Sequence, residues 1–148
     1  MEPIRVVEEE EESPEAASPV QPDDVIGGKY RVTRVLGAGG MGVVVAATHV
    51  ALDRPVAIKF MSPLLAGNEM GVRRFMLEAR AAARIACEHV ARVFDVAALP
   101  DGTPYIVMEY LAGSDLEHLL RTRGRLPLAE AVGYLLDACE AIAEAHVA

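Results

Sequence analysis

The chain has 148 residues, of which 52% are hydrophobic, and its formal net charge is −8 at pH 7. This length predicts one domain with a buried core, since domains usually hold about 100–200 residues, and the acidic balance argues against binding to nucleic acid or anionic membranes. Cys87 and Cys139 lack metal or redox spacing, no run of 18 apolar residues occurs and the N-terminus is acidic, so we expect a cytoplasmic protein with reduced cysteines, no secretory signal and no membrane segment in this chain.

Residues 1–24 differ from the rest of the chain. They hold nine acidic residues and one arginine, including the run Glu8–Glu12, together with prolines at 3, 14, 19 and 22. Residues 25–148 hold 13 acidic and 13 basic residues, so the charge imbalance lies in this first segment. A segment so poor in apolar residues cannot offset its ordering entropy, and we predict a disordered acidic tail over 1–24. A regulatory role for the tail stays an alternative.

The predicted elements follow in chain order. Apolar β-type runs predict five strands, at Tyr30–Leu36, Gly42–His49, Arg54–Met61, Val93–Leu99 and Pro104–Tyr110. Ser62-Pro63 begins a loop to about Asn68, and Glu69–Ala86 is predicted as a helix rich in alanine and arginine. After Ser114 or Asp115 as N-cap, a helix ends at Gly124, and Pro127 opens a last helix over Leu128–Val147.

Glycines 37, 39 and 42 form G-x-G-x-x-G between the first two strands. They leave a hairpin turn without side chains, so backbone N–H groups can approach an anion. Alone, the motif is also compatible with an ordinary flexible turn. A dinucleotide-binding motif would need a helix directly after the glycines, whereas Val43–Ala47 is a β-branched run that predicts a strand.

Lys59 makes the pattern more specific. Strand alternation places Val56, Ile58 and Phe60 on one face, and Ala57, Lys59 and Met61 on the other. A small residue beside a lysine suits a flat ring under the alanine with phosphates reaching the ammonium. The alternative is a solvated strand lysine.

These motifs carry a family resemblance. G-x-G-x-x-G-x-V over 37–44, followed by V-A-I-K over 56–59, resembles the small lobe of protein kinases. The stretches GAGGMGVV and VMEYLAGSDL are similar to bacterial serine/threonine kinases, and the resemblance runs from about Tyr30 to the last residue. It implies an α+β fold, in which a small lobe of a five-stranded antiparallel sheet and one helix (25–108) leads through a hinge (109–114) into two helices of an incomplete large lobe (115–148).

The resemblance also implies a site for ATP. Glycines 37, 39 and 42 would cover the phosphates, Lys59 would hold the α- and β-phosphates, and Glu78 would hold Lys59, which makes Lys59 and Glu78 the catalytic candidates. Met108 matches the residue that guards the back of the pocket, with an ordinary core methionine as the alternative, and Asp115 matches a ribose or substrate contact, with helix capping as the alternative. The expected nucleotide contacts are Leu36, Gly37, Ala38, Gly39, Gly40, Met41, Gly42, Val43, Val44, Ala57, Lys59, Met108, Glu109 and Leu111.

Glu78 has an unusual setting on its predicted helix. Its neighbours Phe75, Ala82 and Ile85 are apolar, so the pattern places the carboxylate on the inward stripe. Because an unpaired buried carboxylate is costly, we predict a pair with Lys59. The alternative is a pair at the rim with Arg74, four residues earlier.

The kinase motifs H-R-D-x-x-x-x-N and D-F-G, which supply the catalytic base and the magnesium ligands, do not occur in these 148 residues. We therefore expect the N-terminal part of a serine/threonine kinase that would use ATP, Mg²⁺ and a protein substrate, cut before its catalytic loop, without metal ligands and inactive by itself. The alternatives are a non-catalytic nucleotide-binding or pseudokinase-like interaction module and a decayed gene fragment.

The last predicted helix is apolar beyond one face. Its stripe is Leu128, Val132, Leu135, Cys139 and Ile142, flanked by further alanine and leucine residues. Such a helix belongs in a lobe core. We expect possible self-association of this chain through the Leu128–Ile142 stretch.

Overall fold

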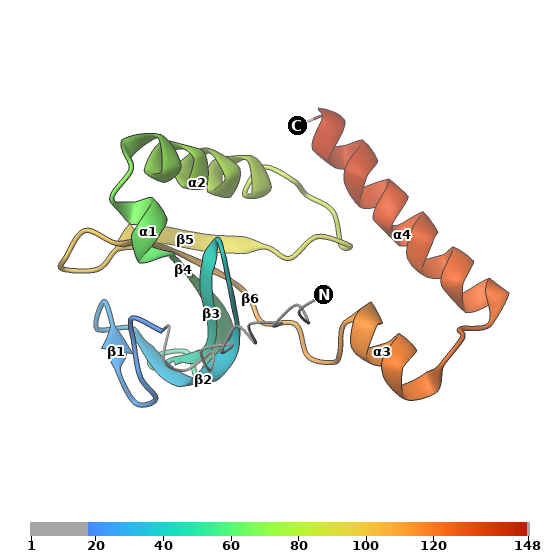
Figure 1. Ribbon diagram of the computed structural model, residues 1–148, viewed down its shortest axis with the longest axis horizontal. Helices are drawn as coiled ribbons and strands as arrows, with labels where there is room; N and C mark the ends of the chain where they lie inside the picture. The colour runs from blue at the N-terminus through green and yellow to red at the C-terminus, as the bar shows by residue number, and fades with distance from the viewer. Residues whose placement is uncertain (1–17, 148) are drawn as a thin grey trace, which may run out of the picture.

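The computed structural model describes residues 18–147 of the chain, and its centre is one antiparallel sheet with strand order β1-β2-β3-β4-β6-β5 (Figure 1). The strands are β1 (Val25–Ile26), β2 (Tyr30–Gly39), β3 (Gly42–His49), β4 (Arg54–Met61), β5 (Val93–Ala98) and β6 (Pro104–Glu109). The helices are α1 (Pro63–Ala66), α2 (Glu69–Ala82), α3 (Leu116–Arg123) and α4 (Leu128–Val147). The predicted α+β architecture is confirmed.

Strand β4 lies inside the sheet, between β3 and β6, and separates two cores. Val56, Ile58 and Phe60 pack in the first core, whereas Met61 belongs to the second core, which α2 covers. The predicted alternation along β4 is therefore confirmed. Because neighbours on both sides fix the register of this strand, the direction of each of its side chains is strongly specified.

Helix α2 covers one face of the sheet (Figure 1). It starts at the N-cap Asn68, whose side chain accepts a hydrogen bond from Met70 N at 2.9 Å. Phe75 and Ala79, one turn apart, are its buried residues. The helix ends at Ala82, four residues before the predicted end, because the following turn tightens to shorter-range bonds such as Arg84 N to Ala81 O. The alanine-rich sequence holds no stop signal at this point.

The structure adds three features that the sequence did not predict. A two-residue strand, β1, pairs with β2, and the four-residue helix α1 occupies the loop expected after Ser62. Residues 18–24, expected in the disordered tail, lie against β2, where Asp23 N donates to Val32 O at 2.9 Å and Val20 is buried in the first core. Their composition predicted exposure to solvent, but Val20 and two backbone hydrogen bonds to Val32 hold them to the sheet. Most of the predicted tail, residues 1–17, lies outside the described residues.

Helices α3 and α4 follow β6 and lie to one side of the sheet (Figure 1). The Asp115 side chain caps α3 by accepting a hydrogen bond from His118 N at 2.6 Å, and Gly124 follows the helix at φ 73°. Arg123 donates two hydrogen bonds to Glu130 across the α3–α4 turn, and these lower the pKa of the Glu130 carboxyl. Asp115 is therefore a helix cap, as one of its two alternatives predicted.

Neither α3 nor α4 contains a buried residue. Helix α4 approaches the rest of the chain where His89 Nε2 lies 3.2 Å from Glu140 Oε2 and 3.9 Å from Asp137 Oδ1. Over residues 18–147, none of the helices combines the length and apolar character that crossing a membrane requires.

Candidate functional site

The glycine motif forms a tight hairpin between β2 and β3. Gly39 pairs with Gly42, so only Gly40 and Met41 make the turn. Gly42 adopts φ 139°, and a Cβ atom at this position would lie 1.9 Å from the Phe60 carbonyl oxygen. Ser62 N donates to Met41 O at 3.1 Å, which ties the hairpin tip to the end of β4. Glycine at 42 is therefore required by backbone conformation and by close packing together.

The sheet register brings the predicted nucleotide-binding side chains of β3 and β4 to one face. Lys59 pairs with Val44 on β3 and with Ile106 on β6, and Ala57 pairs with Met108 on β6. Paired residues of antiparallel strands point to the same side. Val44, Ala57, Lys59 and Met108 therefore share the face that α2 covers further along.

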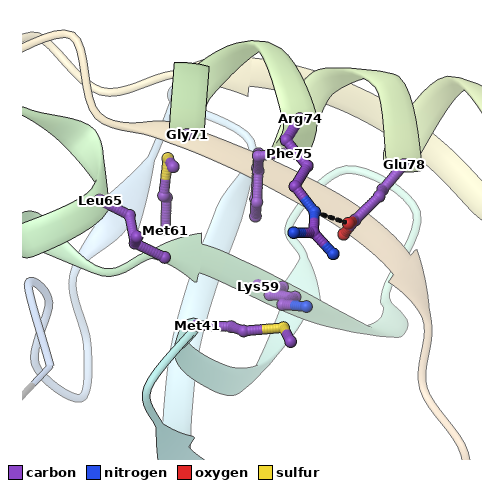
Figure 2. Close-up of a pocket in the computed structure, with 8 residues that line it drawn as sticks. All are labelled: Met41, Lys59, Met61, Leu65, Gly71, Arg74, Phe75 and Glu78. Carbon is purple, nitrogen blue, oxygen red and sulfur yellow. Dashed lines mark hydrogen bonds and ion pairs between the residues drawn. The ribbon is translucent and has the colours of Figure 1, made fainter. Parts of the chain in front are cut away.

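A small cavity of about 210 Å³ lies beside Lys59, between β4 and α2 (Figure 2). We call it the Lys59 pocket, and its lining residues are Met41, Lys59, Met61, Leu65, Gly71, Arg74, Phe75 and Glu78. Only two of these side chains are cationic, Lys59 and Arg74, and one is anionic, Glu78. The hairpin tip lines the same cavity as the lysine through the Met41 side chain, whereas the glycines 37, 39 and 42 are not among its lining residues.

The predicted Lys59–Glu78 pair is not formed in this structure. Glu78 Oε1 instead accepts a hydrogen bond from Arg74 Nε at 2.9 Å, the alternative at the rim (Figure 2). The buried face of α2 is centred on Phe75 and Ala79, so Glu78 lies on its flank with a side chain that is 52% exposed. The carboxylate remains exposed to solvent. It therefore has no burial cost that a pair with Lys59 would have to offset.

Other expected contacts lie in several settings. Val43 is buried in the first core, on the face opposite Lys59, so it supports the hairpin and does not face the nucleotide side. Met108 packs against the second core and pairs with Ala57 on β4, as its core alternative predicted, and its role at the back of the nucleotide pocket stays a prediction. The Glu109 carboxylate accepts a hydrogen bond at 3.2 Å from the backbone N–H of Arg92, the residue directly before β5.

The remaining candidates are open to solvent. Gly37, Ala38, Gly39 and Gly40 lie on the hairpin, and a Cβ atom at glycine 37, 39 or 40 would meet nothing within 4 Å. Leu36 and Leu111 are exposed. Within the described residues, no backbone–backbone hydrogen bond uses Leu111, so its N–H and C=O are available to a ligand.

Several lining residues of the Lys59 pocket escaped sequence reasoning. Met61 and Phe75 line it from β4 and α2, and Leu65 comes from the unpredicted helix α1. Gly71 allows α1 and α2 to approach, since a Cβ atom there would lie 2.9 Å from Leu65 O. A glycine in the first turn of an amphipathic helix is the one signal that could have indicated such a close approach.

Comparison with known proteins settles the family. The sequence model of the protein kinase domain matches residues 30–148. The chain belongs to the protein kinase family. It is 31% identical to a mutant of the Mycobacterium tuberculosis PknI kinase domain, with a TM-score of 0.73, and the match covers 86% of this chain and 52% of that one.

Curated relatives are bacterial serine/threonine-protein kinases. PknA of Corynebacterium glutamicum is 37% identical over 127 residues, which cover 83% of this chain and 27% of the relative. PrkC of Bacillus subtilis is 36% identical over 121 residues, which cover 82% of this chain and 18% of the relative. The chain thus spans about half of the PknI kinase domain and about a quarter or less of these two curated relatives.

Proposed function

We propose that this chain is the ATP-binding part of a serine/threonine protein kinase domain that phosphorylates proteins in the cytoplasm. The observation that carries the proposal is the Lys59 pocket, where a lysine of β4 and the tip of a glycine hairpin line one cavity. Backbone N–H groups without side chains and an ammonium group together suit polyphosphate, which is the part of ATP that a kinase must hold and orient.

Each part of the proposed site has its own role. The hairpin from Gly37 to Gly42 would lie over the phosphates, and Lys59 would hold the α- and β-phosphates. Leu36, Val44 and Ala57 would cover the adenine ring, and the free backbone groups of Leu111 would hydrogen-bond its edge. Glu78, once released from Arg74, would orient the Lys59 ammonium.

The residues present do not fit a magnesium ion. In the part of the chain from 18 to 147, no three His, Cys, Asp or Glu side chains converge to hold a metal. The family takes its Mg²⁺ ligands from motifs that do not occur in these 148 residues.

The first expected result is weak ATP binding. A ligand pocket usually measures about 300–1,000 Å³ and buries about 70–90% of a drug-sized ligand, whereas the Lys59 pocket measures about 210 Å³ and is too small to enclose ATP. We expect a dissociation constant on the order of 1 mM, near −4 kcal/mol. Isothermal calorimetry with ATP measures it. A Lys59→Met variant should lose the remaining binding, and micromolar affinity of the unchanged chain would contradict this estimate of the pocket.

The second expected result is the absence of phosphoryl transfer by these 148 residues alone. Positioning and charge neutralisation account for nearly all catalysis of this reaction, and the catalytic base and the metal-holding aspartate are both absent from the sequence. The measurement is incubation with radiolabelled ATP, magnesium and a basic protein substrate. Phosphorylation above that of Lys59→Met would contradict the expectation. ATP binding without transfer would also fit the alternative of a non-catalytic nucleotide-binding module.

A further inference from the structure

We propose that Arg74 is a positioning residue that withholds Glu78 from Lys59, so that the exchange of one ion pair on α2 controls whether the lysine is oriented. The proposal rests on the proposed function in one respect, since orienting Lys59 matters only if Lys59 holds phosphate. The exchange itself is a property of three side chains lining one pocket, and it is testable without nucleotide.

The Lys59 pocket holds more cationic than anionic side chains. Its two cations are Lys59 and Arg74, and its one anion is Glu78. Figure 2 shows Arg74 and Glu78 extending from α2 toward the strand that carries Lys59, with the carboxylate bound to the guanidinium. One carboxylate therefore faces two candidate partners, and in this structure it is bound to Arg74.

Glu78 has one charged neighbour on its own helix. Side chains three and four residues apart are neighbours on a helix surface. At these spacings Glu78 has Arg74 and Phe75 before it and Ala81 and Ala82 after it. Arg74 is thus its single charged neighbour on α2. If Arg74 loses its charge, Lys59 becomes the one cation of the pocket that remains for Glu78.

The existing ion pair between Arg74 and Glu78 is weak. Arg74 and Glu78 are 79% and 52% exposed, and exposed pairs of this kind shift an equilibrium by roughly 1.4- to fivefold. The pair also has its cation N-terminal to its anion, the less favourable order on a helix. A contact of this strength biases Glu78 toward Arg74 and can still be exchanged for another partner.

The buried face of α2 includes neither Arg74 nor Glu78. Phe75 and Ala79 anchor α2 in the second core, and Asn68 caps its first turn. The exchange would therefore take place beside a helix whose packing face is already formed. Substitution of the exposed Arg74 side chain should leave the fold intact, since substitutions at exposed positions usually change the free energy of unfolding little.

The test is zero-length cross-linking of the full chain with a water-soluble carbodiimide. This reagent joins a carboxylate to an amine only when the two groups come into contact, and mass spectrometry of peptides quantifies the Lys59–Glu78 link. We expect a low yield for the unchanged chain and a rise of roughly 1.4- to fivefold in Arg74→Met, which removes the charge and keeps an apolar stem. Glu78→Gln should abolish the link and verify its identity.

Two further variants separate positioning from general loosening. Arg73→Met removes a neighbouring arginine that is also exposed and does not line the Lys59 pocket, and it should leave the yield unchanged. Arg74→Lys keeps the positive charge but supplies a reactive amine, so it should lower the Lys59–Glu78 yield and give a link between Glu78 and the new lysine instead. Equal yields in the unchanged chain and Arg74→Met, an equal rise in Arg73→Met, or no link in any variant would overturn the inference. Because no nucleotide is used, a chain that fails to bind ATP would refute the proposed function without deciding this result.

Discussion

Gly42→Ala is expected to destabilise the sheet and to abolish ATP binding together. The residue adopts φ 139°, a conformation that side chains rarely allow, and such strain costs about 1–3 kcal/mol by itself. The new methyl group would also lie 1.9 Å from the Phe60 carbonyl oxygen and 2.9 Å from Ser62 N. These are backbone atoms, so no side-chain rotation relieves the overlap, and the hairpin must separate from the end of β4.

The measurement is the free energy of unfolding from denaturant titration, followed by calorimetry with ATP. Gly40→Ala is the matched control, because it adds the same methyl group two residues earlier, where nothing lies within 4 Å. Since Gly40 lies in the same turn, the pair of variants separates local geometry from the general loss of a glycine. We expect the free energy of unfolding of Gly40→Ala to change by no more than about 0.5 kcal/mol. Equal stability of the two variants would show that the backbone at 42 relaxes freely, contrary to this account.

Helix α4 is expected to make the chain self-associate. Leu128, Val132, Leu135 and Ile142 form one exposed stripe on a helix that contains no buried residue. Fully burying each such side chain is worth about 1.5–3 kcal/mol, which is large beside the 5–15 kcal/mol that stabilise a typical domain. Exposed apolar surfaces of this kind mark interfaces or sites of aggregation.

Light scattering coupled to size-exclusion chromatography measures this association. The full chain should elute as a dimer or a larger species, and the double variant Leu135→Glu with Ile142→Glu should shift it to the monomer. Ala141→Glu with Ala145→Glu adds the same charge to the same helix away from the stripe, and it should leave the association intact. A monomeric unchanged chain would contradict the prediction and would show that α4 is covered in solution.

Local sequence patterns were sufficient for most of the fold. Strands β3 and β4 begin and end where alternation and the flanking glycine and proline predicted, and α4 spans its predicted residues. Gly42 opens β3, Ser62-Pro63 ends β4, and Pro127 opens α4. The end of α2 had none, because Ala83 and Arg84 favour a helix and only the tightened turn after Ala82 terminates it.

The site was less predictable than the fold. The sequence indicated Lys59 and the glycine hairpin, because strand alternation and a glycine motif are local properties. The partner of Glu78 depends on where α2 turns its buried face, and that face is set by Phe75 and Ala79 in the second core. Glu78 lies on the flank of that face, where a sequence pattern alone does not decide whether a carboxylate is buried. Gly71 and α1 depend on the same tertiary contact.

Mapping of amide chemical shifts by NMR during an ATP titration shows whether the glycine hairpin and the face of Val44, Ala57, Lys59 and Met108 bind ATP. We expect shifts concentrated at residues 36–44, 57–59 and 108–111, with weak saturation on the order of 1 mM, and their loss in Lys59→Met. Shifts that map elsewhere, to α4 or to the loop around His89, or no shifts at saturating ATP, would contradict it.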